Sequence, residues 1–167
     1  MSIFLAERLE GATRLAVMGV GSELRADDVA GLLVARRLKA ALRGRDDVLV
    51  VEGCSAPENF TGEILRFEAS HLVIVDCAEL DAPPGTVKLF PVDEIGGLSS
   101  STHSLPLSII IAYLDRCHPC QTLVVGIQPK TLAFDGRPSE EALRAADEVA
   151  SRILAATDGM RKAGARA

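Results

Sequence analysis

The stretch "RLAVMGVGSELRADDVAGLLVARRLKAALR" (residues 14–43) decides the fold class of this chain. Its first seven residues (14–20) form a short apolar run with no polar face, which is typical of a strand buried between two layers. Residues 27–43 then show the apolar spacing of an amphipathic helix. A buried strand that leads into a helix is the repeating unit of parallel α/β sheets.

The same alternation of apolar runs and helical patterns continues along the chain. Further apolar runs predict strands at residues 48–53, 71–77, 85–92 and 121–127. Helical periodicity separates them, at residues 57–69, 105–117 and 139–156. The run at 85–92 alternates enough to suggest an edge strand. Together these units predict a three-layer α/β/α sandwich with a mostly parallel, roughly five-stranded central sheet. We expect one domain over 1–156 and a flexible tail over 157–167.

Charge and hydropathy exclude several classes of function. The chain has 167 residues and a formal net charge of −5. Nucleic acids and anionic membranes are bound by basic faces, so neither is expected as a partner. No apolar run reaches the roughly 18 to 20 residues of a membrane span, and the first residues lack the pattern of a signal peptide. We therefore expect a cytoplasmic protein without membrane insertion.

The loop after the first strand resembles a dinucleotide-binding loop only in part. The stretch "GVGSEL" (residues 19–24) has Leu24 where that motif requires a third glycine. Glu23, Asp27 and Asp28 then follow where phosphate would lie, and carboxylates repel phosphate. Glu52 does end the second strand at the position of a ribose-binding acid, so a nucleotide-binding α/β protein stays as a minor alternative.

Polar residues gather at the ends of several predicted strands. In doubly wound sheets the carboxyl ends of the strands form the binding edge. An acid of the pair Asp27 and Asp28, the strand-end Asp76 and His103 all belong to segments that can reach that edge. Two carboxylates and one imidazole suit a divalent transition metal better than calcium. Three protein ligands also leave coordination positions open, which favours a catalytic or substrate-sensing site over a structural one.

Two other kinds of site have weaker support. The pair Cys117 and Cys120 has the spacing of a redox motif or of half a zinc site, but no second CxxC completes it. The hydroxyl-rich stretch "SSSTHS" (99–104) surrounds His103, yet no GxSxG elbow follows any strand. A serine hydrolase is therefore not favoured, and the role of the two cysteines stays open.

Six short motifs occur together in this chain. They are "GVGSELRADDVAG" (19–31), "GCSAPEN" (53–59), "LVIVDCAE" (72–79), "PPGTVKLF" (83–90), "STHSLPL" (101–107) and "VVGIQP" (124–129). In order and spacing this set resembles the nickel-iron hydrogenase maturation endopeptidases, most closely the hydrogenase 3 type. The resemblance implies an α/β/α fold with a five-stranded sheet.

The resemblance also assigns the site. It implies that Asp28, Asp76 and His103 are both the catalytic residues and the metal ligands. Either acid of the pair could cap the following helix, so with Asp28 as the ligand we interpret Asp27 as the helix cap. The resemblance implies a protease that removes a C-terminal extension from a nickel-iron hydrogenase large-subunit precursor after nickel insertion. The nickel in the precursor is then the recognition element, although other divalent metals can occupy such a site. A monomer is expected, because the edge must stay open to a large partner.

Some positions depart from the family pattern or have two interpretations. Ser22, Val29 and Cys77 differ from the usual residues, and Cys77 would bring a soft sulfur near the metal. Glu58 and Gln128 either shape substrate binding and support the ligands, or only hydrogen-bond to the loops. A nickel-sensing chaperone that binds the precursor without cutting it is the alternative function, because it needs the same ligands.

Overall fold

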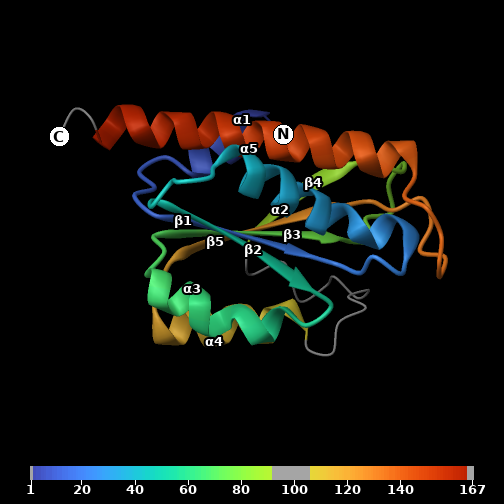
Figure 1. Cartoon of the computed structure of the whole chain (residues 1–167), viewed down its shortest axis with the longest axis horizontal. Helices are drawn as coiled ribbons and strands as arrows, with labels where there is room; N and C mark the ends of the chain where they lie inside the picture. Colours follow the sequence, from blue (N-terminus) through green and yellow to red (C-terminus); the bar gives the residue numbers. More distant parts are fainter. Residues whose placement is uncertain (1, 92–105, 165–167) are drawn as a thin grey trace.

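The computed structural model of the chain describes residues 2–91 and 106–164 (Figure 1). Strands and helices alternate along it as the sequence predicts. In chain order the elements are α1 (Ser2–Arg8), β1 (Leu15–Val20), the 3-10 helix η1 (Ala26–Val29), α2 (Ala30–Ala41), β2 (Val48–Cys54), the 3-10 helix η2 (Pro57–Phe60), α3 (Thr61–Phe67), β3 (His71–Cys77), β4 (Val87–Pro91), α4 (Leu107–Cys117), β5 (Gln121–Ile127) and α5 (Glu140–Gly164).

The five strands form one sheet in the order β2-β1-β3-β5-β4. The pairs β1–β2, β1–β3 and β3–β5 are parallel, and β4 is antiparallel to β5 at the edge. The predicted five-stranded, mostly parallel sheet is therefore confirmed, and β4 (Val87–Pro91), within the run predicted as an edge strand, does lie at the edge. Every residue of β1 and β3 is buried, as expected for strands covered on both faces.

Helices cover both faces of the sheet and make two hydrophobic cores. Leu5 of α1, Val34 of α2 and Ile153 of α5 pack with side chains from one face. Ile64 of α3 and Ile111 of α4 pack against the other. Figure 1 shows α1, α2 and α5 on one side of the strands and α3 and α4 on the opposite side. The result is the expected three-layer α/β/α sandwich.

Two glycines let α2 lie directly on the carboxyl ends of the central strands. A Cβ atom on Gly31 would overlap the carbonyl oxygens of Val20 and Val75, and one on Gly19 would overlap the Gly31 carbonyl oxygen. Close helix–strand packing is the role of the third glycine in a dinucleotide-binding loop. Here Gly31 has that role from within the helix, so the loop before it is free to carry acids.

The last helix differs from the sequence prediction. We expected helix to residue 156 and a flexible tail from 157, but α5 continues to Gly164. Thr157 is fully buried and Met160 is 9% exposed in the core beneath α1 and α5. Residues 157–160 therefore belong to the folded domain. Although α5 is long, no helix in the described ranges is both long and apolar enough to cross a membrane.

Candidate functional site

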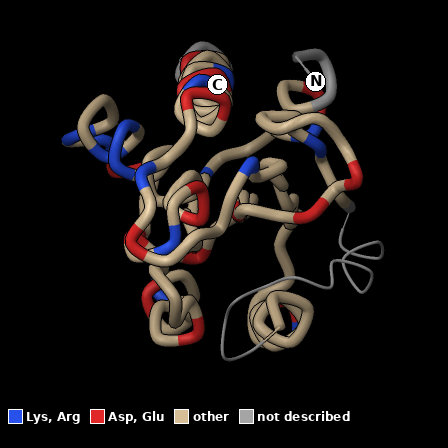
Figure 2. Tube along the Cα trace, turned by 90° about the vertical axis from the view of Figure 1, so that its right-hand side faces the viewer, with Lys and Arg blue, Asp and Glu red and all other residues tan. Residues whose placement is uncertain are grey.

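Asp28 and Asp76 both lie at the carboxyl edge of the sheet. Asp76 is the sixth residue of β3, the middle strand, and is only 4% exposed. Its Oδ1 accepts a hydrogen bond from the Cys77 amide at 2.8 Å. Asp28 is on η1, directly after the β1 loop, and is 3% exposed. Figure 2 looks onto this side of the molecule and shows acidic and basic positions interspersed. Two buried carboxylates are therefore presented at one edge.

Tight backbone packing fixes the position of Asp28. Its amide donates to the Arg25 carbonyl at 2.9 Å. Gly21 has φ of 143°, and a Cβ atom there would overlap the Asp28 carbonyl oxygen. The second glycine of "GVGSEL" thus lets the start of the β1–α2 connection pack against η1. This use of a glycine requires no phosphate.

The negative charges of both carboxylates act on the Cys77 thiol. Burial raises the pKa of this thiol, and the nearby charges of Asp76 and Asp28 raise that pKa further. Without a bound metal, the thiol therefore stays protonated at neutral pH. Successive strand residues also point to opposite faces, so the sulfur faces away from the side to which Asp76 points. The soft sulfur expected near a metal is present as a neutral thiol.

The third predicted ligand, His103, lies outside the described residues. The described chain resumes at Pro106, the N-cap of α4. Since α4 ends at Cys117 and β5 begins at Gln121, α4 runs back along the sheet and must begin at the carboxyl edge. The described part contains no group of three or more His, Cys, Asp and Glu side chains arranged around a metal position. Only two members of the predicted set, Asp28 and Asp76, fall within it.

Asp27 has a different role from the one expected. No side chain caps η1 or α2, so the interpretation of Asp27 as their helix cap is wrong. Its fully buried carboxylate instead accepts hydrogen bonds from the amides of Lys130, Thr131 and Ser139 and from the Ser139 hydroxyl, at 2.6 to 3.2 Å. Ser139 in turn caps α5 through the Ala142 amide. Asp27 thus fastens the loop after β5 to the loop after β1.

Gln128 also fastens loops at this edge. Its side chain is 4% exposed, and its Oε1 accepts from the Leu80 amide at 2.6 Å. Its Nε2 donates to Glu79 Oε1 at 2.7 Å and to the Pro129 carbonyl at 3.1 Å. These contacts support the interpretation in which Gln128 hydrogen-bonds to the loops. Glu58, in η2, is half-buried beyond the end of β2.

Strained backbone marks the same edge. Ala26 and Cys54 have positive φ angles, 41° and 51°, although neither is a glycine. Such conformations persist only where the surroundings hold them, and they often occur at functional sites. Ala26 immediately precedes the acidic pair, and Cys54 ends β2. The sequence offers no signal for this strain, because neither residue type favours positive φ.

The predicted residues away from the site lie at the opposite edge. His71 begins β3, and Cys117 and Cys120 precede β5. Both cysteines are free. His71 is only 4% exposed, and its Nδ1 lies 3.0 Å from Ser70 Oγ. Burial lowers its pKa. These residues have no part in the site.

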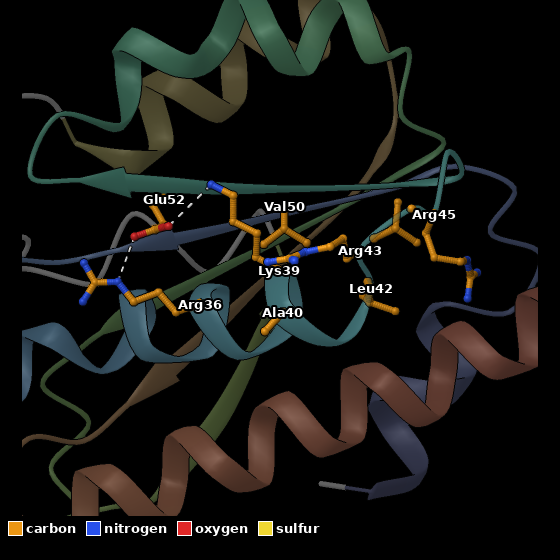
Figure 3. Close-up of a pocket in the computed structure, with 10 residues that line it drawn as sticks. Arg36, Lys39, Ala40, Leu42, Arg43, Arg45, Val50 and Glu52 are labelled. Atoms are coloured by element: carbon orange, nitrogen blue, oxygen red, sulfur yellow. Dashed lines mark hydrogen bonds and ion pairs between the residues drawn. The ribbon is translucent and has the colours of Figure 1, made fainter.

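A cavity of about 510 Å³ lies between α2 and β2 and does not include either acid of the site (Figure 3). Four cations line it, but most of them are paired. Arg36 contacts Glu23 at 2.7 Å and Glu52 at 2.8 Å, and Lys39 lies 3.5 Å from Glu52. Glu52 thus forms ion pairs with two cations of α2. It is the acid whose position at the end of the second strand suggested a nucleotide-binding protein as an alternative. The pairing gives no support to a nucleotide site.

Together these features define an α/β/α protein with two buried acids at the carboxyl edge of a mostly parallel sheet. The family model of the hydrogenase maturation proteases (HycI) matches residues 32–156. The chain therefore belongs to the hydrogenase maturation protease family, which is a family of peptidases. The resemblance seen in the motifs is confirmed.

Individual relatives agree with this assignment. The chain is 32% identical, over 92% of its length and 94% of the relative's, to a Methanocaldococcus jannaschii protein described as a candidate hydrogenase maturation protease. It is 33% identical to the hydrogenase 3 maturation protease of Escherichia coli K12, over 69% and 72% of the two chains. The crystal structure of the NiFe hydrogenase maturation protease HycI from Thermococcus kodakarensis has a TM-score of 0.85 and 30% identity, covering 92% of this chain and 97% of its own.

Proposed function

We propose that this protein is an endopeptidase that removes the C-terminal extension of a nickel-iron hydrogenase large-subunit precursor after nickel has been inserted. One observation carries the proposal: in a member of the maturation protease family, two buried carboxylates, Asp28 and Asp76, lie at the carboxyl edge of the sheet. Burying a carboxylate is costly unless it is paired, hydrogen-bonded or bound to a metal. Asp76 is hydrogen-bonded by the Cys77 amide, and the placement of both acids at a binding edge supports their contact with a metal as well when substrate is present.

We propose that Asp28, Asp76 and His103 contact the nickel of the precursor and serve as the catalytic residues. Carboxylate and imidazole donors suit nickel and other divalent transition metals. The nickel supplies Lewis-acid polarisation at the scissile bond. The protein supplies position, because the Cys77 amide and the packing of Gly21 against η1 fix the two aspartates before substrate arrives. Holding the scissile bond at this edge, next to the catalytic residues, makes a bimolecular step effectively unimolecular.

We also propose that the protein works as a cytoplasmic monomer. A large precursor must reach Asp28 and Asp76, so the edge that carries them has to stay open. A stable dimer through that edge would block access. The alternative, a chaperone that senses nickel without cleaving, would use the same ligands and the same surface.

Cleavage of purified precursor distinguishes these functions. Nickel-loaded and nickel-free precursor are each incubated with the protein, and the intact mass of the precursor is measured. We expect loss of the C-terminal extension from the loaded form alone. Binding of the loaded form without any mass loss would identify the chaperone, and equal cleavage of both forms would refute recognition of nickel.

A further inference from the structure

The outer edge of β2 is open along the described chain. β2 is the first strand in the sheet order β2-β1-β3-β5-β4, so no strand within residues 2–91 and 106–164 pairs with its outer side. The Leu15 amide of β1 donates to the Asp47 carbonyl at 3.0 Å. Backbone groups of successive strand residues point to opposite sides, so those of Val48, Val50 and Glu52 face away from β1. Unpaired strand edges of this kind are templates for an additional strand.

A groove with two side-chain walls lies beside this edge, between β2 and α2 (Figure 3). It is the cavity of about 510 Å³ that includes neither Asp28 nor Asp76. Val48, Val50 and Glu52 alternate along β2, so their side chains share one face of the strand. The opposite wall has residues at helical spacing on α2 and the turn after it: Arg36, Lys39, Ala40 and Arg43. At about 3.3 Å per residue, the wall along β2 matches an extended segment of about five residues.

The groove is basic, although the whole chain is acidic. Four cations and one acid line it, whereas the chain has a formal net charge of −5. Three of these cations have carboxylate partners, and the pairs are Arg36 with Glu23 and Glu52, Lys39 with Glu52, and Arg45 with Asp47. Arg43 is exposed and makes no ion pair with any described residue. Because Lys39 is 60% exposed and shares its acid with Arg36, it can contact acids of a partner, as Arg43 can.

These features favour an extended acidic segment as the occupant. A small anion would need several donors that converge on one point, but three of the four cations already bind carboxylates. Pairing of β2 with a second copy of this chain would set two basic grooves side by side, and like charges repel. In an added strand every second side chain would face the groove, so acids at alternate positions would meet Lys39 and Arg43.

The groove leads to the candidate site. β2 runs parallel to β1, so both strands end at the carboxyl edge that presents Asp28 and Asp76. At this end of the groove Arg36 forms an ion pair with Glu23, which lies in the connection between β1 and η1. A segment bound along β2 would therefore end at the edge where the two aspartates lie.

We propose that the outer edge of β2, together with this groove, is a docking edge that binds an extended acidic segment of the large-subunit precursor as an added strand. The backbone groups of Val48, Val50 and Glu52 exchange hydrogen bonds with the segment. Its acidic side chains contact Lys39 and Arg43. This inference rests on the proposed function and adds where on the protein the precursor docks.

Hydrogen exchange followed by mass spectrometry tests strand addition directly. The protein is measured alone and with nickel-free precursor, which the proposed function leaves uncut, so the complex persists. We expect the amides of residues 48–52 to exchange about fivefold more slowly, or slower still, in the complex, because the outward N–H groups become hydrogen-bonded. β4, at the other end of the sheet, is the reference and should not change. Unchanged exchange over 48–52, or the absence of any complex, would overturn the proposal.

Val50→Pro tests the backbone contact. Proline has no N–H to donate, and it is tolerated on an edge strand where the N–H faces outward. We expect the Kd for labelled precursor, measured by fluorescence anisotropy, to rise by about threefold to tenfold. Val50→Thr is the matched control, because it keeps both the N–H and the β-branched shape. Equal Kd values for the two variants would refute the backbone contact, and thermal unfolding checks that each variant is folded.

Arg43→Glu tests the charge complementarity without changing β2. We expect the Kd to rise by about fivefold at low salt and by less at about 0.5 M sodium chloride, because salt screens exposed charges. Arg116→Glu is the matched control, since Arg116 is also exposed near the end of a helix, and α4 lies on the opposite side of the sheet (Figure 1). A Kd that Arg43→Glu leaves unchanged would refute an acidic segment.

Binding and cleavage are scored separately, so the docking edge and the protease can fail independently. Slower exchange at β2 without any cleavage of nickel-loaded precursor would support the docking edge and refute the protease. Cleavage with unchanged exchange at β2 would support the protease and refute the docking edge. Sedimentation of the protein alone tests the other occupant. A dimer that Val50→Pro disrupts would show that β2 pairs with a second copy of this chain, and would overturn the proposal.

Discussion

Asp27 and Ser139 are joined by two hydrogen bonds across 112 positions of the sequence. Asp27 Oδ1 accepts from the Ser139 amide at 2.6 Å, and Oδ2 accepts from the Ser139 hydroxyl at 2.9 Å. The residue beside the proposed ligand Asp28 thus fixes the start of α5. The loop after β1, the loop after β5 and the last helix consequently form one rigid unit at the carboxyl edge.

Asp27→Ala should strongly destabilise the protein. The change leaves the amides of Lys130, Thr131 and Ser139 without their acceptor in a part-buried loop. Hydrogen bonds to charged groups contribute about 1.5 to 3 kcal/mol each, and the losses overlap, so we expect the free energy of unfolding to fall by about 3 kcal/mol. Urea denaturation measures this. Asp46→Ala, at an exposed turn residue, is the control, and an equal effect of both changes would contradict the role of Asp27.

Gly31→Ala should be among the most damaging small changes in the chain. The added methyl group would overlap the carbonyl oxygens of Val20 and Val75, which belong to central strands and cannot easily move. Overpacking of this kind costs about 3 kcal/mol. Gly159→Ala is the matched control, because nothing lies within 4 Å of the new methyl group, and a helix interior gains about 0.5 to 1 kcal/mol from alanine. We expect Gly31→Ala to lower the midpoint of thermal unfolding and Gly159→Ala to raise it.

Met160→Ala tests whether the end of α5 belongs to the core. Met160 is buried in the same cluster as Leu5 of α1 and Leu9, which directly follows that helix, so truncation should cost about 2 to 4 kcal/mol of unfolding free energy. The adjacent exposed Asp158→Ala should change the stability by less than about 0.5 kcal/mol. Chemical denaturation of the two variants decides the matter. If Met160→Ala were also neutral, residues 157–164 would be the flexible tail that the sequence first suggested.

Stability should decrease in mild acid because of His71. Burial lowers the pKa of this imidazole below its ordinary value of 6.5, so the unfolded chain binds a proton more readily than the folded one. The free energy of unfolding is therefore expected to fall as the pH drops through about 6.5 and to recover above it. His71→Gln should reduce the loss measured between pH 7.5 and 5.5. An identical pH dependence in the variant would show that His71 does not contribute.

Most of the fold could be predicted from the sequence, because buried parallel strands leave a strong pattern. The runs at 14–20, 71–77 and 121–127 match β1, β3 and β5 within one residue at either end. The end of α5 was missed because its final turns carry charged residues and a glycine, which mask the two buried positions. Met160 is buried in a cluster with Leu5 of α1, a short helix whose contact with α5 no local pattern reveals.

The site was predictable only in part. The positions of Asp28 and Asp76 at one edge follow from the parallel direction of the strands, which the alternating pattern implies. The separate roles of Asp27 and Asp28 do not follow, since two adjacent acids look alike until a loop more than 100 residues away supplies donors to one of them.

The most direct test of the account is the intact mass of nickel-loaded large-subunit precursor after incubation with the unaltered protein and with Asp76→Asn. This change keeps the size of the side chain and removes its charge, and circular dichroism confirms that the fold is retained. The account predicts loss of the C-terminal extension with the unaltered protein and an unchanged precursor mass with Asp76→Asn. Cleavage by Asp76→Asn at the rate of the unaltered protein would contradict it.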